Sequence, residues 1–162
     1  MTPDQKDVMK PSRRLHPKSL LILSVIALAT LGTTIASAKP APFVPSPGSY
    51  SGTSTTLGQS FETKGGVHVH KGNVSLNVSV RALMSCADGS TESLDQGFVA
   101  RPKGKTFAVK ASGASGSTGY YHYELSGKFT SKTSFSGTFN VKGTSNTAGS
   151  CSGTSQFSLK KG

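Results

Sequence analysis

The sequence predicts an all-β protein, and within that class an antiparallel up-and-down β-barrel of about eight strands. Three observations lead to this fold class. Apolar and polar residues alternate with period two, no helical apolar period follows the N-terminal segment, and Gly, Asn, Asp, Pro and Lys separate the short strand candidates. A two-sheet β-sandwich fits the same pattern and is the alternative, because both architectures bury one face of each strand.

Residues 1–38 are predicted to be a signal peptide. Basic residues dominate its start, an apolar run occupies residues 20–31, and small residues at 36–38 form a cleavage site. The apolar run is about a dozen residues long, short of the ~20 that a membrane-spanning helix needs. We therefore expect cleavage before Lys39, a secreted extracellular protein, and no transmembrane anchor after cleavage. Residues 12–14 partly resemble a twin-arginine signal, so the export route stays open.

Residues 39–47 are predicted to form a proline-rich linker, and residues 48–162 a single β domain. The four prolines of the linker favour an extended, stiff chain. Five of the 18 Lys and Arg residues and two of the seven Asp and Glu residues precede Lys39, so residues 39–162 carry a net charge of +8. Such a basic surface attracts polyanions, although solubility is the plainer explanation of the charge.

The clearest strand extends from Val74 to Cys86. Its alternate residues are apolar and most of the residues between them are polar, which places Val78 inside and Ser79 outside, with Leu83 as the exception. This run is long enough to bend. The other strand candidates are residues 49–55, 60–64, 67–70, 92–100, 106–111, 120–130, 133–142 and 150–160.

A Ser-Gly motif after an apolar residue occurs four times, with its glycines at Gly52, Gly127, Gly137 and Gly153. Glycine weakens a strand, so its repeated use favours a strongly coiled sheet in which glycine relieves crowding on the concave side. The first and last copies are the most similar. This similarity is compatible with a barrel that closes by pairing its first and last strands.

The two cysteines are predicted to form one disulfide, since an exported chain meets an oxidising environment. Cys86 shares parity with the apolar residues of its strand, and Cys151 shares parity with Phe157 and Leu159. Both side chains therefore point inward. Closing so long a loop contributes roughly 4 kcal/mol to stability in the chain-entropy model.

The pattern at residues 48–53, the run Cys86-Ala-Asp-Gly-Ser and the run Cys151-Ser-Gly resemble small secreted bacterial β-rich proteins of uncharacterised function. The resemblance covers most of residues 39–162. It implies a compact disulfide-bearing β domain and brings no activity with it. Avidin-like and lipocalin-like barrels share the predicted shape, but their ligand pockets or sequence signatures rely on tryptophan, which this sequence lacks, so none of their binding residues is assigned here.

We expect no enzymatic activity, no catalytic residue and no cofactor. Residues 149–153 have the Gly-x-nucleophile-x-Gly spelling of a hydrolase elbow, but that elbow needs a strand-to-helix turn in an α/β sheet. Glu92 and Asp95 are close in sequence, yet their odd spacing sends them to opposite faces of a strand, which does not suit a glycosidase pair.

Two groups of residues are candidates for binding a partner. Arg101, Lys103 and Lys105 form a basic loop that would bind anions, and a solvated turn is the plainer interpretation. Tyr120 and His122 share a face and would form an interaction patch for a partner such as a glycan, with ordinary packing as the alternative.

His68 and His70 are weak candidates for a metal site. They project from one face of a strand, but zinc usually takes three or four protein ligands and no further ligand is evident. The alternative is that both histidines simply face water. We therefore predict no metal site.

Together these features predict an extracellular, non-enzymatic binding or surface-interaction module with a basic surface. The expected partner is an anionic polymer or a cell-envelope surface, and no nucleic acid is expected. The alternative function is a lipocalin-like carrier of a small apolar ligand, which needs an interior cavity of roughly 300 Å³ or more. The sequence does not specify the oligomeric state.

Overall fold

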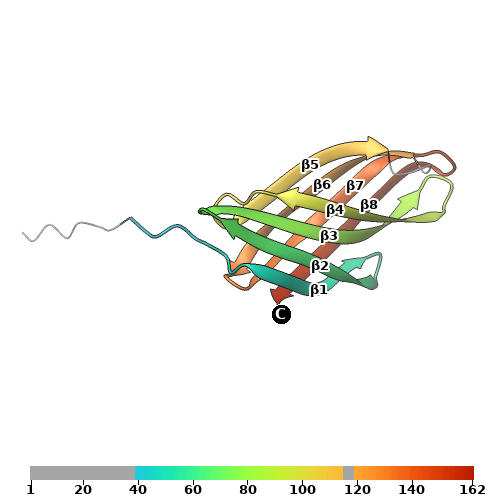
Figure 1. Ribbon diagram of the computed structural model, residues 1–162. Coiled ribbons are helices and arrows are strands. Elements are labelled where there is room, and N and C mark those ends of the chain that lie inside the picture. Colours follow the sequence, from blue (N-terminus) through green and yellow to red (C-terminus); the bar gives the residue numbers. More distant parts are fainter. Residues whose placement is uncertain (1–38, 115–118) are drawn as a thin grey trace, which may run out of the picture. The chain divides into compact units, whose positions relative to one another are not determined.

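The computed structural model describes residues 39–114 and 119–162, which form eight β-strands (Figure 1). The predicted signal peptide and its cleavage site lie outside the described residues. The strands are β1 (Gly48–Thr56), β2 (Gln59–His70), β3 (Asn73–Cys86), β4 (Thr91–Ala100), β5 (Thr106–Ala114), β6 (Gly119–Ser131), β7 (Ser134–Ser145) and β8 (Gly149–Lys161). Within the described part of the chain, no helix is long and apolar enough to cross a membrane.

The strands form one antiparallel sheet that curls into a barrel (Figure 1). Its order is β4-β3-β2-β1-β8-β7-β6-β5, so β4 and β5 are the edge strands and a loop at residues 101–105 joins them. The first strand pairs with the last, with Ser54 opposite Phe157. The predicted up-and-down barrel and its closure through β1 and β8 are therefore confirmed, and the two-sheet sandwich is not the fold.

Strand β2 combines two segments that the sequence predicts as separate strands, residues 60–64 and 67–70. The glycines between them interrupt the alternation of side chains, but Gly65 stays in the ladder opposite Tyr50 of β1. A Cβ on Gly65 would lie 2.9 Å from the carbonyl oxygen of Asn77. Glycine at this position therefore permits close packing within a strand instead of starting a turn.

Strand β3 changes partners along its length. Its first half pairs with β2, whereas Cys86 at its end lies opposite Cys151 of β8. Where β3 leaves β2, the Thr56 hydroxyl accepts a hydrogen bond from the Leu83 amide at 3.2 Å and donates one to the Leu83 carbonyl at 3.3 Å. This change of partner brings the two cysteines together.

Aromatic side chains fill the interior of the barrel. The buried rings are Tyr50, Phe98, Phe107, Tyr121, Tyr123, Phe129, Phe135, Phe139 and Phe157. Neighbouring rings among them have centroids 5.2 to 6.5 Å apart, a range typical of favourable aromatic packing. Val78 is buried and Ser79 is exposed, as the alternation in β3 predicts.

The glycines of the repeated Ser-Gly motif lie where strands and rings approach closely. A Cβ on any of the four would come closer than 3.0 Å to a neighbouring atom. Gly127 and Gly137 are opposite each other on β6 and β7, and the rings of Phe107 and Phe157 lie against them. The glycines of the motif therefore permit the close approach of strands and rings in the curved wall, as the sequence predicts.

Candidate functional site: a basic end and a disulfide end

The up-and-down strand order brings alternate connections to the same end of the barrel. The connections after β2, β4 and β6 lie at one end, on the left of Figure 1, together with the start of β1 and the C-terminus. The turns after β3 and β7 lie at the other end. These two ends differ in charge and in chemistry.

Seven exposed cations occupy the first end, which we call the basic end. They are Lys71, Arg101, Lys103, Lys105, Lys132, Lys160 and Lys161. The connections at residues 71–72, 101–105 and 132–133 contain no Asp or Glu. The sequence-based prediction found only the three cations of one loop, since the other four are dispersed along the chain and only the strand order reveals their common position.

Backbone hydrogen bonds fix the loop that carries the three predicted cations. The Lys103 amide donates to the carbonyl oxygen of Thr106 at 2.8 Å, and the Thr106 amide donates back at 3.2 Å. The carbonyl oxygen of Lys105 accepts from the Phe129 amide at 2.7 Å. The loop backbone is therefore held to the barrel, while the side chains of Arg101, Lys103 and Lys105 stay exposed.

The proline-rich linker packs against the same end. It forms no strand or helix, but the ring of Phe43 lies 5.6 Å from that of Phe129, and the Lys105 ammonium lies 5.3 Å from the Phe43 ring centroid. The buried Tyr50 hydroxyl donates to the carbonyl oxygen of Ser46 at 2.7 Å. Burial raises the pKa of Tyr50 above its usual value. The linker is therefore attached to the barrel through Phe43 and Ser46. Its proline-rich composition alone did not predict these contacts.

On the barrel wall, unlike at the basic end, three cations pair with carboxylates. The pairs are Lys64 with Glu62 at 3.3 Å, Lys110 with Glu124 at 3.2 Å, and Arg81 with Asp95 through two hydrogen bonds of 2.8 and 2.7 Å. These pairs use three of the five carboxylates in residues 39–162. Lys128 and Lys142 are the other two cations of the wall, so the excess positive charge lies mainly at the basic end.

The structure keeps the two candidate metal-binding histidines on the outer face of β2. His68 and His70 are exposed, while Val67 and Val69 point inward. The His68 Nε2 atom lies 3.5 Å from the Asn77 side-chain nitrogen. Within residues 39–114 and 119–162, neither histidine belongs to a group of three metal-ligating side chains.

Tyr120 and His122 lie next to each other on the outer face of β6. Their rings are 5.6 Å apart and nearly perpendicular, and the Tyr120 hydroxyl donates to Ser112 at 3.2 Å. Both residues line a shallow hollow of about 440 Å³ that also includes Lys142. The patch is therefore solvent-accessible, with Tyr120 53% exposed.

The predicted disulfide is present at the other end of the barrel, which we call the disulfide end. Cys86 and Cys151 are directly opposite on β3 and β8, with their Cα atoms 4.1 Å apart, and both are buried. Cys151 is bonded and lies within a strand, so residues 149–153 do not form a hydrolase elbow. In the neighbouring turn, hydrogen bonds from Ser90 hold the pKa of Asp88 below its usual value.

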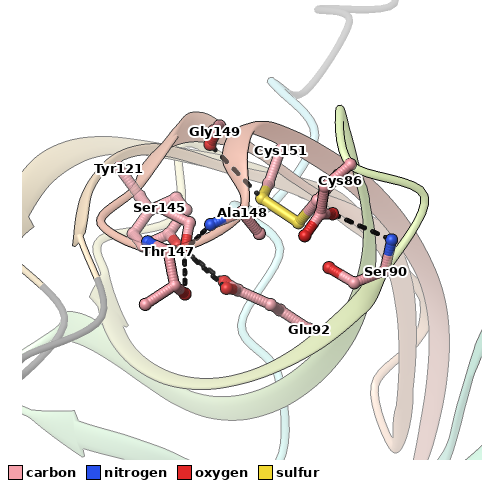
Figure 2. The surroundings of a disulfide bond; sticks show 10 residues. Cys86, Ser90, Glu92, Tyr121, Ser145, Thr147, Ala148, Gly149 and Cys151 are labelled. Carbon is pink, nitrogen blue, oxygen red and sulfur yellow. Dashed lines mark hydrogen bonds between the residues drawn. A yellow bond between two sulfur atoms is a disulfide. The ribbon is translucent and has the colours of Figure 1, made fainter.

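Glu92 of β4 faces the disulfide from inside the mouth of the barrel (Figure 2). Its carboxylate accepts hydrogen bonds from the Tyr121 hydroxyl at 2.8 Å and the Ser145 hydroxyl at 2.5 Å. One of its oxygens lies within 4.8 Å of both sulfur atoms. Burial, together with the hydrogen bond to Glu92, raises the pKa of Tyr121.

Sequence reasoning considered Glu92 only as half of a glycosidase pair, and missed this arrangement. The alternation of residues along β4 could have predicted it. Glu92 shares the inner face of β4 with Leu94 and Phe98, both of which are buried. A carboxylate on an inner face must find donors, because burying an unpaired charge costs several kcal/mol. Tyr121 and Ser145 provide them from β6 and β7.

None of the protein-family models and none of the curated proteins matches this chain. Among solved structures, a redesigned β-barrel is similar, with 17% sequence identity and a TM-score of 0.35. The match covers 72% of this chain and 90% of the other.

Proposed function

We propose that this protein is an extracellular, non-enzymatic module that binds an anionic polymer of the cell envelope through its basic end. The observation that carries the proposal is the separation of charge. Seven exposed cations lie at the end where the connections contain no carboxylate, while the barrel wall balances most of its cations with acids. Grouped cations raise the local concentration of a polyanion by electrostatic attraction.

A polymer suits this end better than a membrane surface does. The linker turns Phe43 toward the barrel, where it packs against Phe129, so this ring is not free to enter a bilayer. The cations are instead carried on three separate connections and at the end of β8, around the rim of the barrel. Such an arrangement favours charge-based, salt-sensitive contact with a chain of phosphate or sulfate groups.

The test compares two variants with the same change in net charge. Arg101, Lys103 and Lys105 are replaced by serine in one variant, and Lys64, Lys110 and Lys142 of the wall are replaced by serine in the other. On a dextran sulfate column, we expect the first variant to elute at clearly lower salt than the second. Salt should release the parent steeply, since exposed charges are screened beyond about 8 Å at physiological ionic strength.

Equal elution of the two variants would mean that net charge, and not the basic end, causes retention. Binding of the parent to vesicles of anionic lipid, without retention on dextran sulfate, would replace the polymer with a membrane as the partner. Tyr120→Ala and His122→Ala extend the test to the patch on β6. Loss of retention in these variants would assign binding to the wall.

The alternative function, a carrier of a small apolar ligand, finds less support. A carrier keeps its apolar cavity inside the barrel. Here the aromatic rings occupy the interior, and the hollow beside Tyr120 and His122 opens on the outer face. A fluorescent apolar probe that bound tightly and was competed by fatty acids would favour the carrier instead.

A further inference from the structure

We propose that the dithiol form of this chain binds one divalent metal ion of the zinc type through Cys86, Cys151 and Glu92. This form exists before the disulfide closes and after its reduction. The site lies at the disulfide end, away from the cations of the basic end. It is independent of the proposed polyanion binding.

Three ligand atoms already converge at this end. The two sulfur atoms and one carboxylate oxygen of Glu92 lie within 4.8 Å of one another. A tetrahedral zinc ion holds sulfur at about 2.3 Å and carboxylate oxygen at about 2.0–2.2 Å, which places its ligand atoms about 3.5 to 4 Å apart. Opening the sulfur–sulfur bond and small side-chain rotations therefore suffice to place all three atoms around one ion.

The hydrogen bonds around Glu92 would orient it as a ligand. Tyr121 and Ser145 each donate to a different carboxylate oxygen, and both donors are buried. Each oxygen keeps a further lone pair for a metal ion. The Ser145 hydroxyl is held in turn by the Ala148 amide at 3.3 Å. Such outer contacts fix the direction of a ligand and raise metal affinity.

The local charge also favours a cation. The turns at residues 87–90 and 146–148 contain no Lys or Arg. Two thiolates beside the Glu92 carboxylate would therefore place three negative charges in a half-buried site without a basic side chain from these turns. A divalent ion offsets two of these charges, and thiolate sulfur is a preferred ligand of zinc.

A tertiary phosphine can reduce the disulfide to the dithiol form. The phosphine attacks one sulfur and water hydrolyses the adduct, which gives the phosphine oxide and the thiols of Cys86 and Cys151. The metal ion then displaces both thiol protons as it forms two metal–sulfur bonds, and both protons pass to the buffer. The oxidised protein has no thiolate to offer and should not bind the ion.

The experiment reduces the purified chain with a water-soluble phosphine, removes the reagent without oxygen, and titrates with cobalt(II). We expect the visible absorption of tetrahedral cobalt and a thiolate charge-transfer band, saturating at one ion per chain and displaced by zinc. The oxidised chain and the Cys86→Ser, Cys151→Ser double variant should show neither signal. Glu92→Gln should weaken affinity by roughly ten- to a hundredfold.

Glu124→Gln is the matched control, because it removes a carboxylate from the wall and should leave cobalt affinity unchanged. Each variant is first compared with the parent in its oxidised form by circular dichroism. If reduction itself unfolds the parent, cobalt must restore its β signal, since metal binding then couples to folding. No restoration, equal affinity of Glu92→Gln and the parent, or one ion per two chains would overturn the proposal.

Discussion

Both ends of the barrel consist of connections between antiparallel strands, but they are stabilised in different ways. At the disulfide end, a covalent bond joins β3 to β8, and Glu92 of β4 receives two hydrogen bonds from β6 and β7. At the basic end, the exposed cations have no carboxylate in their connections, and the attached linker provides the packing. This comparison predicts that the disulfide end contributes more to stability than the basic end, whose cations are exposed.

The largest expected effect is the loss of the disulfide. Replacing Cys86 and Cys151 by serine should lower the free energy of unfolding by roughly 4 kcal/mol, because the bridge closes a loop with a sequence separation of 65. Urea denaturation followed by circular dichroism measures this loss. Retention on dextran sulfate should not change below the unfolding transition. A double variant as stable as the parent would remove the basis for contrasting the two ends.

The hydrogen bond from Tyr121 to Glu92 gives the next largest effect. Tyr121→Phe should destabilise the protein by about 1.5–3 kcal/mol, since it removes a hydrogen bond to a charged acceptor in a half-buried position. Tyr120→Phe is the matched control, because it removes an exposed hydroxyl that bonds only Ser112 in the described part of the chain. Urea titrations of both variants measure the difference. Equal losses would mean that the Glu92 network contributes no more than a surface contact.

A pH titration tests the linker at the basic end. The pKa of Tyr50 is raised above its usual value of 10.0 by burial. The contribution of Tyr50 to the free energy of unfolding is therefore fully present below pH 10. It is lost as the pH rises through the pKa of Tyr50 in the folded state. Thermal melts between pH 8 and 11 should show an alkaline decline that is smaller in Tyr50→Phe. An unchanged decline in that variant would assign the effect to other groups, Tyr121 among them.

The sequence predicted the barrel because its evidence is local. Alternation in β3, the four Ser-Gly motifs and the parity of the two cysteines depend only on neighbours along a strand. The seven-cation end and the Glu92 network were not predicted, because both need strand order and register. The polar residues inside the barrel were not predicted either. Ser54 and Ser155 are fully buried, although their type is typical of the outer face.

The smallest effect on stability is expected at the basic end. Replacing Arg101, Lys103 and Lys105 by serine should change the free energy of unfolding by less than about 0.5 kcal/mol, because exposed loop charges contribute little. Two small terms oppose each other. The variant relieves repulsion among like charges. It also loses the contact of Lys105 with the Phe43 ring, and an exposed cation–π contact of this kind contributes about 0.5–1 kcal/mol.

Salt and a single substitution separate these two terms. Sodium chloride should stabilise the parent more than the triple variant, since it screens repulsion among the seven cations. Lys105→Ser should be slightly less stable than Arg101→Ser, because Lys105 has the ring contact and both variants lose one charge. Thermal melts at low and high salt measure both differences. A triple variant destabilised by several kcal/mol would show that the basic end maintains the fold, and the division of roles between the two ends would then be wrong.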